Sequence, residues 1–344
     1  MTSTARRRWS AELQSEIDGI ALSPDGPILV HLYDAPAGGM WIDEVIPGKL
    51  GAIDRNSGET LWSSPCEVGY GRGFGAGFGE GDEVIVVGPS AQGHRIVRME
   101  SATGKLLGAE SIDSFDEAHV YGDVCICASA ARVFAVSTPM MAEAWHYSRE
   151  GERYHQVGRL GDRILVVYSD LKRQLKGVLI LDVITGDRIG TFLEPCLPEI
   201  HGLAVEGDMV ALLTADVQAA LTETLAVRFL LDLSKFEDAE GDIAVDTLTL
   251  LGLSIDESGK GVSEWYEIVS TQPDQELPEA SITADCAKLY IVKGALVEVR
   301  DLLTGRILGD WTIPGLDEFV DWRVSQGAGL LAEEHRISVY ELPA

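Results

Sequence analysis

The chain has 344 residues, and 46% of them are hydrophobic, which is enough to bury a sizeable core. Its 55 acidic residues outnumber its 27 basic residues and give a formal charge of −28. This charge disfavours binding to nucleic acid or to an anionic membrane, because both need clustered cations. It favours solubility and a basic partner instead.

The cysteines and the lack of long apolar runs indicate in which compartment the protein resides. The five cysteines are Cys66, Cys125, Cys127, Cys196 and Cys286. An odd and scattered set is typical of free thiols in a reducing compartment. Acidic residues rather than an apolar segment follow Arg6-Arg7-Arg8, and no run reaches about 18 apolar residues. We therefore expect a cytoplasmic protein without an export signal or a transmembrane helix.

The N-terminal segment 7–13 predicts a strand that belongs with the other end of the chain. The last unit, residues 316–342, has only three predicted strands of its own. A strand from the N-terminus would complete it, with Trp9 in the place that Trp62 takes in the first unit. Such a shared blade leaves no open sheet edges.

A strand, a tight turn and a second strand at residues 52–62 form the pattern that recurs along the chain. Asp54 can accept hydrogen bonds within the turn, Gly58 supplies a positive φ, and Leu61-Trp62 begin the next strand. Clear copies follow at 100–107, 182–189 and 301–308, with degraded copies at 136–145 and 232–235. Seven units of about 49 residues predict an all-β fold, a single seven-bladed propeller domain over residues 1–344.

The Asp-x-x-Ser/Thr-Gly-x-x-Leu-Trp turn resembles the repeat of the pyrroloquinoline-quinone-like (quinoprotein-dehydrogenase-like) propeller superfamily. That superfamily contains enzymes as well as scaffold and binding proteins, so the resemblance implies a fold rather than an activity. Its quinone-dependent dehydrogenases have a disulfide between two adjacent cysteines, whereas Ile126 separates Cys125 from Cys127 here. We therefore predict no organic cofactor, and we interpret these two cysteines as small core residues on one face of a strand.

Two segments in the first part of the chain are candidates for binding. The first unit, 14–62, has a loop at 34–41 in which Trp41 either contacts a partner or folds back onto its own blade. Glycine occupies every odd position from 69 to 81, so an extended strand would have one bare face. Its other face would carry Tyr70, Arg72, Phe74, Ala76, Phe78 and Glu80. The bare face admits a ligand, a peptide or a neighbouring strand, unless the segment is a loop.

The later units are predicted at 115–150, 154–195, 199–252 and 254–313. The fifth carries an acidic loop at 236–242, and the sixth has long loops at 256–261 and 272–278. Long loops on a rigid scaffold are where recognition usually resides.

Alignment of the units on their Gly-Asp-like turns indicates a set of equivalent positions near the entry of each innermost strand. The set includes Asp116, His155, His201 and Asp321, with His119, Glu199 and Glu279 as neighbours. In a propeller these entries converge at one mouth of the central channel. Imidazoles and carboxylates there can bind a divalent metal or perform acid–base chemistry. The alternative interpretation is a solvated polar rim.

These observations predict a non-enzymatic binding or scaffold protein that holds a peptide or protein across its channel face and long loops. The predicted partner-binding residues are Trp41, Tyr70, Arg72, Phe74, Phe78, His119, Glu199 and Glu279. An alternative is a metal-dependent lyase or hydrolase served by Asp116, His155, His201 and Asp321. A quinone-dependent dehydrogenase is a weaker alternative. The sequence has no Gly-x-Ser-x-Gly, P-loop or His-Glu-x-x-His motif.

Overall fold

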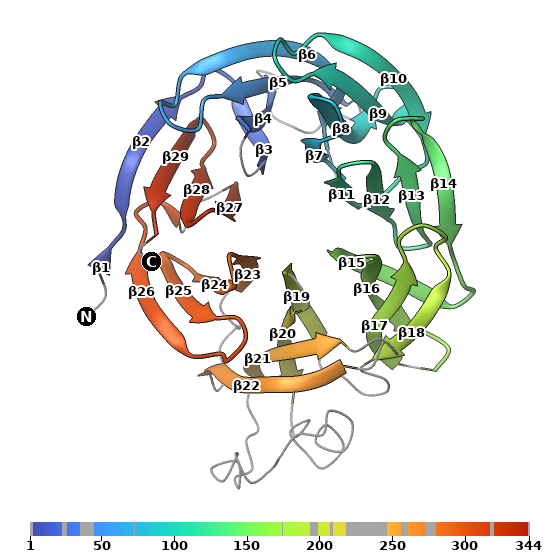
Figure 1. The fold of residues 1–344 in the computed structure, drawn as a ribbon, viewed down its shortest axis with the longest axis vertical. Coiled ribbons are helices and arrows are strands. Elements are labelled where there is room, and N and C mark those ends of the chain that lie inside the picture. Colours follow the sequence, from blue (N-terminus) through green and yellow to red (C-terminus); the bar gives the residue numbers. More distant parts are fainter. Residues whose placement is uncertain are drawn as a thin grey trace, which may run out of the picture. The chain divides into compact units, whose positions relative to one another are not determined.

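The computed structural model describes residues 3–22, 26–34, 45–71, 73–173, 175–192, 199–206, 209–217, 246–255, 261–272, 280–316 and 320–342. Every element recorded in these residues is a β-strand, which confirms the all-β prediction (Figure 1). The strands form seven sheets, in which consecutive strands pair antiparallel. In the described part of the chain, no helix is long and apolar enough to cross a membrane.

The chain folds as two compact units, and the larger one comprises Thr4–Ser148 and Ile313–Ala344. It contains four sheets of four strands each (Figure 1). Their strands are β2 (Arg6–Glu12), β29 (Arg336–Glu341), β28 (Ala328–Ala332) and β27 (Asp321–Ser325); β3 (Glu16–Leu22), β4 (Ile28–Tyr33), β5 (Ile46–Ile53) and β6 (Thr60–Tyr70); β7 (Gly75–Phe78), β8 (Glu83–Ser90), β9 (Gly93–Glu100) and β10 (Leu106–Ile112); and β11 (Glu117–Tyr121), β12 (Val124–Ala128), β13 (Val133–Ser137) and β14 (Ala142–Tyr147).

The smaller unit comprises Arg149–Thr312 with Met1–Ser3 and contains three sheets. Their strands are β15 (Glu152–Leu160), β16 (Arg163–Asp170), β17 (Leu175–Asp182) and β18 (Arg188–Phe192); β19 (Glu199–Glu206), β20 (Met209–Val217), β21 (Asp246–Ile255) and β22 (Gly261–Gln272); and β23 (Ala280–Asp285), β24 (Lys288–Lys293), β25 (Leu296–Asp301) and β26 (Ile307–Thr312), with β1 (Ser3–Thr4) beside β26.

The last sheet is completed by the N-terminal strand, as predicted. Strand β2 pairs antiparallel with β29, with Trp9 opposite Val339. Its bounds differ by one residue from the predicted segment 7–13. The N-terminus therefore supplies the outermost strand of the C-terminal sheet.

One boundary prediction is wrong. Strand β22, at Gly261–Gln272, pairs with β21 and belongs to the fifth sheet, whereas the sequence placed these residues in the sixth unit, 254–313. The degraded turn at 232–235, which suggested the earlier boundary, lies outside the described residues. Because the turn motif before this strand is degraded in the sequence, only its pairing with β21 identifies β22 as the fourth strand of the fifth sheet.

The repeated turn forms through hydrogen bonds among near neighbours. The Oδ1 atom of Asp54 accepts hydrogen bonds from the backbone N–H groups of Asn56 at 3.0 Å and Ser57 at 2.7 Å. Gly58 has a φ of +76°, which a residue without a Cβ adopts readily. Asp182 and Asp301 repeat the arrangement through the N–H groups of Thr185 and Thr304.

In five of the sheets, the segment that follows the third strand is also joined by a backbone hydrogen bond to the first turn of the same sheet. Ser101 N donates to Asp82 O at 2.9 Å, and Thr138 N donates to Asp123 O at 2.9 Å. Corresponding bonds join Val183 to Asp162, Leu302 to Ala287 and Leu342 to Gly327. At Val183 and Leu302 these bonds place the Asp-x-x-Thr-Gly turn beside the first turn of its sheet, at the same end of that sheet.

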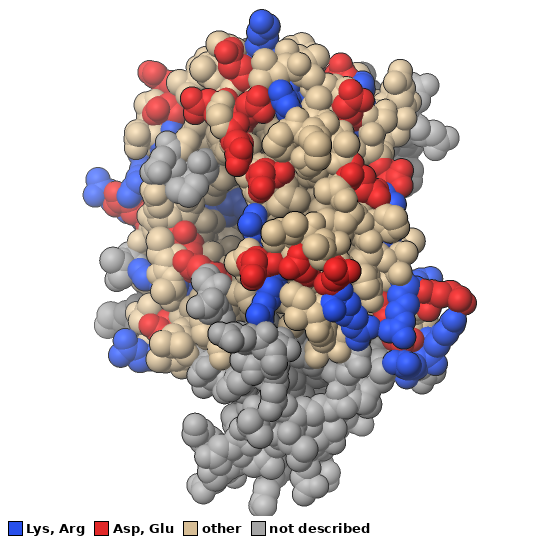
Figure 2. All heavy atoms as spheres, turned by 45° about the vertical axis from the view of Figure 1, so that its right-hand side comes forward, with Lys and Arg blue, Asp and Glu red and all other residues tan. Residues whose placement is uncertain are grey.

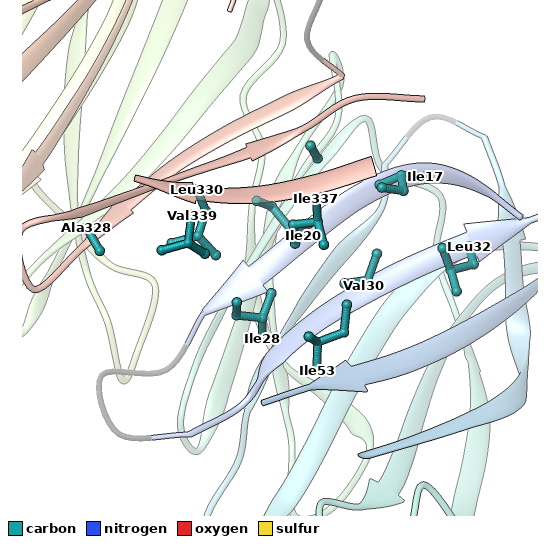
Figure 3. Packing of buried hydrophobic residues seen from close by; sticks show 11 residues of the cluster. Ile17, Ile20, Ile28, Val30, Leu32, Ile53, Ala328, Leu330, Ile337 and Val339 are labelled. Carbon is teal, nitrogen blue, oxygen red and sulfur yellow. The ribbon is translucent and has the colours of Figure 1, made fainter. Parts of the chain in front are cut away.

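Apolar side chains between adjacent sheets make the core. In the larger unit, Ile17, Ile20 and Ile28 of the first sheet pack against Leu330 and Val339 of the last (Figure 3). Another cluster of the larger unit includes Cys125 and Cys127, whose fully buried Sγ atoms lie 3.8 Å apart. This confirms that both cysteines are core residues on one face of β12.

The glycine-rich segment is not one continuous strand, because β6 ends at Tyr70 and β7 begins at Gly75. In β7 the bare face lies against β11. A Cβ atom added to Gly75 would lie 2.7 Å from the carbonyl oxygen of Ala118, and one added to Gly77 would lie 2.7 Å from the Cβ atom of Val120. Of the alternatives that the sequence left open, the bare face of β7 therefore admits a neighbouring strand.

Candidate functional site

The four predicted metal ligands are distributed over both units. Asp116 is exposed, and its Oδ2 atom accepts a hydrogen bond from Ala130 N at 3.3 Å. His155 is exposed as well, with Nε2 3.0 Å from the Oγ atom of Ser169. His201 lies on β19, but its side chain is outside the described part of the structure. A site made by these four residues stays a prediction.

Asp321, the fourth of these residues, links two inner strands of the larger unit. Its Oδ2 atom accepts a hydrogen bond from Ile20 N at 3.1 Å, which joins β27 to β3. Its Oδ1 atom lies 3.1 Å from Nε of Arg323. Burial raises the pKa of the Asp321 carboxyl, although Arg323 and the backbone N–H groups oppose this shift. The carboxylate therefore holds two sheets together.

A buried imidazole lies on the same sheet as Ile20. His31 is fully buried, with Nδ1 2.9 Å from Oδ2 of Asp18 and Nε2 3.2 Å from the carbonyl oxygen of Val68. Its ring stacks on Phe74, with centroids 4.4 Å apart and an interplanar angle of 10°. A Cβ atom at Gly48 would lie 2.4 Å from Nε2, so only glycine leaves room for the ring. The imidazole thus connects β3, β4 and β6, and it stacks on Phe74, the residue that precedes β7.

Two tyrosines lie beside this imidazole along the sheet. The rings of Tyr33 on β4 and Tyr70 on β6 are 4.2 Å apart and tilted by 34°. Tyr33 lies opposite Glu16 in the pairing of β4 with β3. Burial, followed by the nearby carboxylate of Glu16, raises the pKa of Tyr33. The sequence identified Tyr70 but missed Glu16, His31 and Tyr33, because a polar residue inside an apolar run resembles an ordinary strand position.

Glu16 also approaches the turn between β28 and β29. One donor atom each of Glu16, Glu334 and His335 lies within 4.8 Å of the others. Two backbone hydrogen bonds hold this turn, one from Leu13 N, between β2 and β3, to His335 O at 2.7 Å and one from Ile17 N, on β3, to Glu334 O at 2.8 Å. Two carboxylates and an imidazole therefore converge from distant parts of the sequence.

The other predicted partner-binding residues have different surroundings. Phe78 packs against the core cluster that contains Val84 and Val86. Nε2 of His119 lies 2.7 Å from Oε1 of Glu117. Trp41, Arg72 and Glu279 lie outside the described residues, as does the side chain of Glu199. On the face that Figure 2 shows, acidic and basic side chains are interspersed.

No protein-family model matches the sequence, and no curated protein matches it. Two solved structures are similar in fold. The computationally designed Ika8 protein is 12% identical, with a TM-score of 0.53, over 98% of this chain and 99% of that one. BamB from Moraxella catarrhalis is 13% identical, with a TM-score of 0.50, over 98% of this chain and 100% of that one. At these identities the likeness shows the fold alone, so the chain is a β-propeller that resembles BamB, a propeller of PQQ-like repeats.

Proposed function

We propose that this chain is a non-enzymatic binding or scaffold protein that holds a peptide or protein partner. In this proposal the seven sheets are the seven blades of one ring, with β2 completing the last. The partner lies across the channel face and is contacted by the long loops. The protein is cytoplasmic and binds neither nucleic acid nor membranes.

The observation that supports the proposal most directly is that polar side chains on the innermost strands of the larger unit hydrogen-bond to neighbouring strands. Asp321 accepts a hydrogen bond from Ile20 N, and Asp18 lies 2.9 Å from His31. These groups are fixed between strands rather than arranged as a nucleophile with its base. A surface fixed in this way is preorganised, which lowers the entropy lost on binding.

The charge of this region favours a basic partner. Glu16 and Asp18 lie on β3, and Asp321 lies on the adjacent β27, with Arg323 as the cation recorded beside Asp321. The formal charge of the whole chain is −28. Complementary charges accelerate encounter with a cationic segment and select against anionic ones.

The test is binding of the full chain to three peptide sets of equal length, one basic, one neutral and one acidic. We expect the basic set to bind, with an affinity that falls as salt is added. Tyr70→Ala should weaken binding, whereas Tyr147→Ala, a half-buried tyrosine on β14, should leave it unchanged. Absence of binding by all three sets, together with turnover of a small molecule by the purified chain, would overturn the proposal.

A further inference from the structure

We propose that Glu16, Glu334 and His335 form a binding site for a divalent transition-metal ion of the zinc class. The site is separate from the metal site that the sequence suggested, and it does not depend on the proposed scaffold function. It lies wholly within the larger unit, where the start of β3 meets the turn between β28 and β29.

The three side chains are close enough to share one ion. The three donor atoms lie within 4.8 Å of one another, and bonds of about 2.1 Å to one ion place donors roughly 3 to 4 Å apart. The side chains need to close by only about 1 Å to satisfy such bonds. Glu334 and His335 are exposed and can make this movement, while backbone hydrogen bonds from Leu13 and Ile17 hold their main chain.

The charge of the cluster also favours a cation. Two carboxylates lie close together, and in the described part of the chain no Lys or Arg forms a recorded ion pair with either. The nearby guanidinium of Arg336 pairs instead with Glu333 and Glu12. Like charges at this separation repel one another, and a divalent cation between them reverses the sign of the interaction.

A buried phenol lies close to Glu16, the less exposed of the two carboxylates. Tyr33 is 6% exposed and is the β4 residue opposite Glu16 in the β3–β4 pairing. Carboxylates that ligate metals are commonly oriented by a hydrogen bond from a second residue, and this phenol is placed to supply one.

The donor set selects the class of ion. An imidazole nitrogen favours zinc, cobalt and related ions over calcium and magnesium, which prefer oxygen ligands throughout. Three protein ligands also leave at least one coordination position open. A carboxylate, imidazole or water from outside the chain can occupy that position.

The experiment uses the full chain, stripped with chelator, in a Cys196→Ser/Cys286→Ser background. The background matters because Cys286 is an exposed thiol that could bind the same ions. Co²⁺ is titrated while its visible absorption is recorded, and Zn²⁺ is then added. We expect one equivalent of Co²⁺ to bind and Zn²⁺ to displace it. His335→Ala and Glu334→Gln should each lower the affinity at least about tenfold.

His146→Ala is the matched control, because His146 is also an exposed histidine beside a carboxylate, with Nδ1 2.8 Å from Oε1 of Glu143. It should leave the titration unchanged. Zn²⁺ should raise the melting temperature of the parent but not of E334Q/H335A, which also tests whether the variant is folded. Absence of stoichiometric binding by the parent, or equal binding by E334Q/H335A, would overturn the proposal.

Discussion

The indole ring of Trp62 on β6 lies on Gly104, in the turn between β9 and β10 of the adjacent sheet. A Cβ atom at Gly104 would come within 2.4 Å of the ring, and the indole N–H donates to Ser101 O at 2.7 Å. Trp9 and Gly58 repeat the arrangement, with the Trp9 N–H donating to Arg55 O at 2.8 Å. The tryptophan and the glycine of the repeat therefore meet between neighbouring sheets rather than within one sheet.

This contact predicts that Gly104→Ala destabilises the fold. The new methyl group would collide with Trp62 at a backbone φ of +68°, so overpacking and backbone strain add. We expect a loss of about 2–4 kcal/mol in the free energy of unfolding, measured by urea denaturation. Gly81→Ala is the control, because Gly81 has a φ of +70° but no atom within 4 Å of an added Cβ. Equal losses of unfolding free energy in the two variants would show that the indole ring moves away from the new methyl group at no energetic cost.

His31→Leu should destabilise the larger unit. The apolar side chain fills the space but leaves Asp18 and the carbonyl of buried Val68 without the imidazole. We expect a loss of about 2 kcal/mol or more, because unsatisfied buried acceptors keep their desolvation penalty. His146→Leu, at an exposed site, should change the unfolding midpoint little. A stable H31L variant would indicate that water replaces the imidazole.

The carboxylates of the repeated turns make stability depend on pH. Hydrogen bonds from Thr185 and Thr304 lower the pKa of Asp182 and Asp301 below the usual 3.8. The bonds that these carboxylates accept therefore stabilise the fold above pH 3.8, and this stabilisation is lost as the pH falls through the folded-state values. Denaturation followed by circular dichroism should show a smaller acid-induced loss for Asp182→Asn/Asp301→Asn than for the parent. Parallel curves for the two proteins would contradict this expectation.

Asp321 should respond in the opposite direction. Burial raises its pKa, so ionisation is less favourable in the folded chain, and this residue disfavours folding as the pH rises above its usual value of 3.8. Asp321→Asn keeps an oxygen for Ile20 N and removes the buried charge, so its unfolding midpoint should depend less on pH. Asp321→Ala leaves the Ile20 N–H unpaired and should lose about 1–3 kcal/mol. Equal stability of D321N and D321A at neutral pH would refute a role for this hydrogen bond.

The cysteines should differ in their reaction with a thiol reagent. Burial raises the pKa of Cys127 well above its usual value and that of Cys66 to about 11, which leaves little thiolate. Cys286 is exposed, although the charge of Asp285 raises its pKa as well. Mass mapping of the native chain after brief alkylation should find Cys286 labelled, with Cys66, Cys125 and Cys127 protected until denaturant is added. Early labelling of Cys127 would mean that its sheet opens readily.

The sequence by itself determined the all-β class, the repeated turns and the pairing of the two ends, but not the sheet to which β22 belongs. These features depend on local chemistry, such as the carboxylate of Asp54 binding N–H groups two and three residues away. Strand periodicity likewise follows from the alternation of side chains. The fold-level resemblance to PQQ-like propellers followed from the same turn.

Only the tertiary structure decided what the sheets bring together. The contact of Trp62 with Gly104, the strand that covers Gly75, and the hydrogen bond from Ile20 to Asp321 all join different sheets. The convergence of Glu16 with His335 joins opposite ends of the chain. Such contacts depend on how one sheet packs on the next. The spacing of residues within a repeat carries no information about the distance between residues of different sheets.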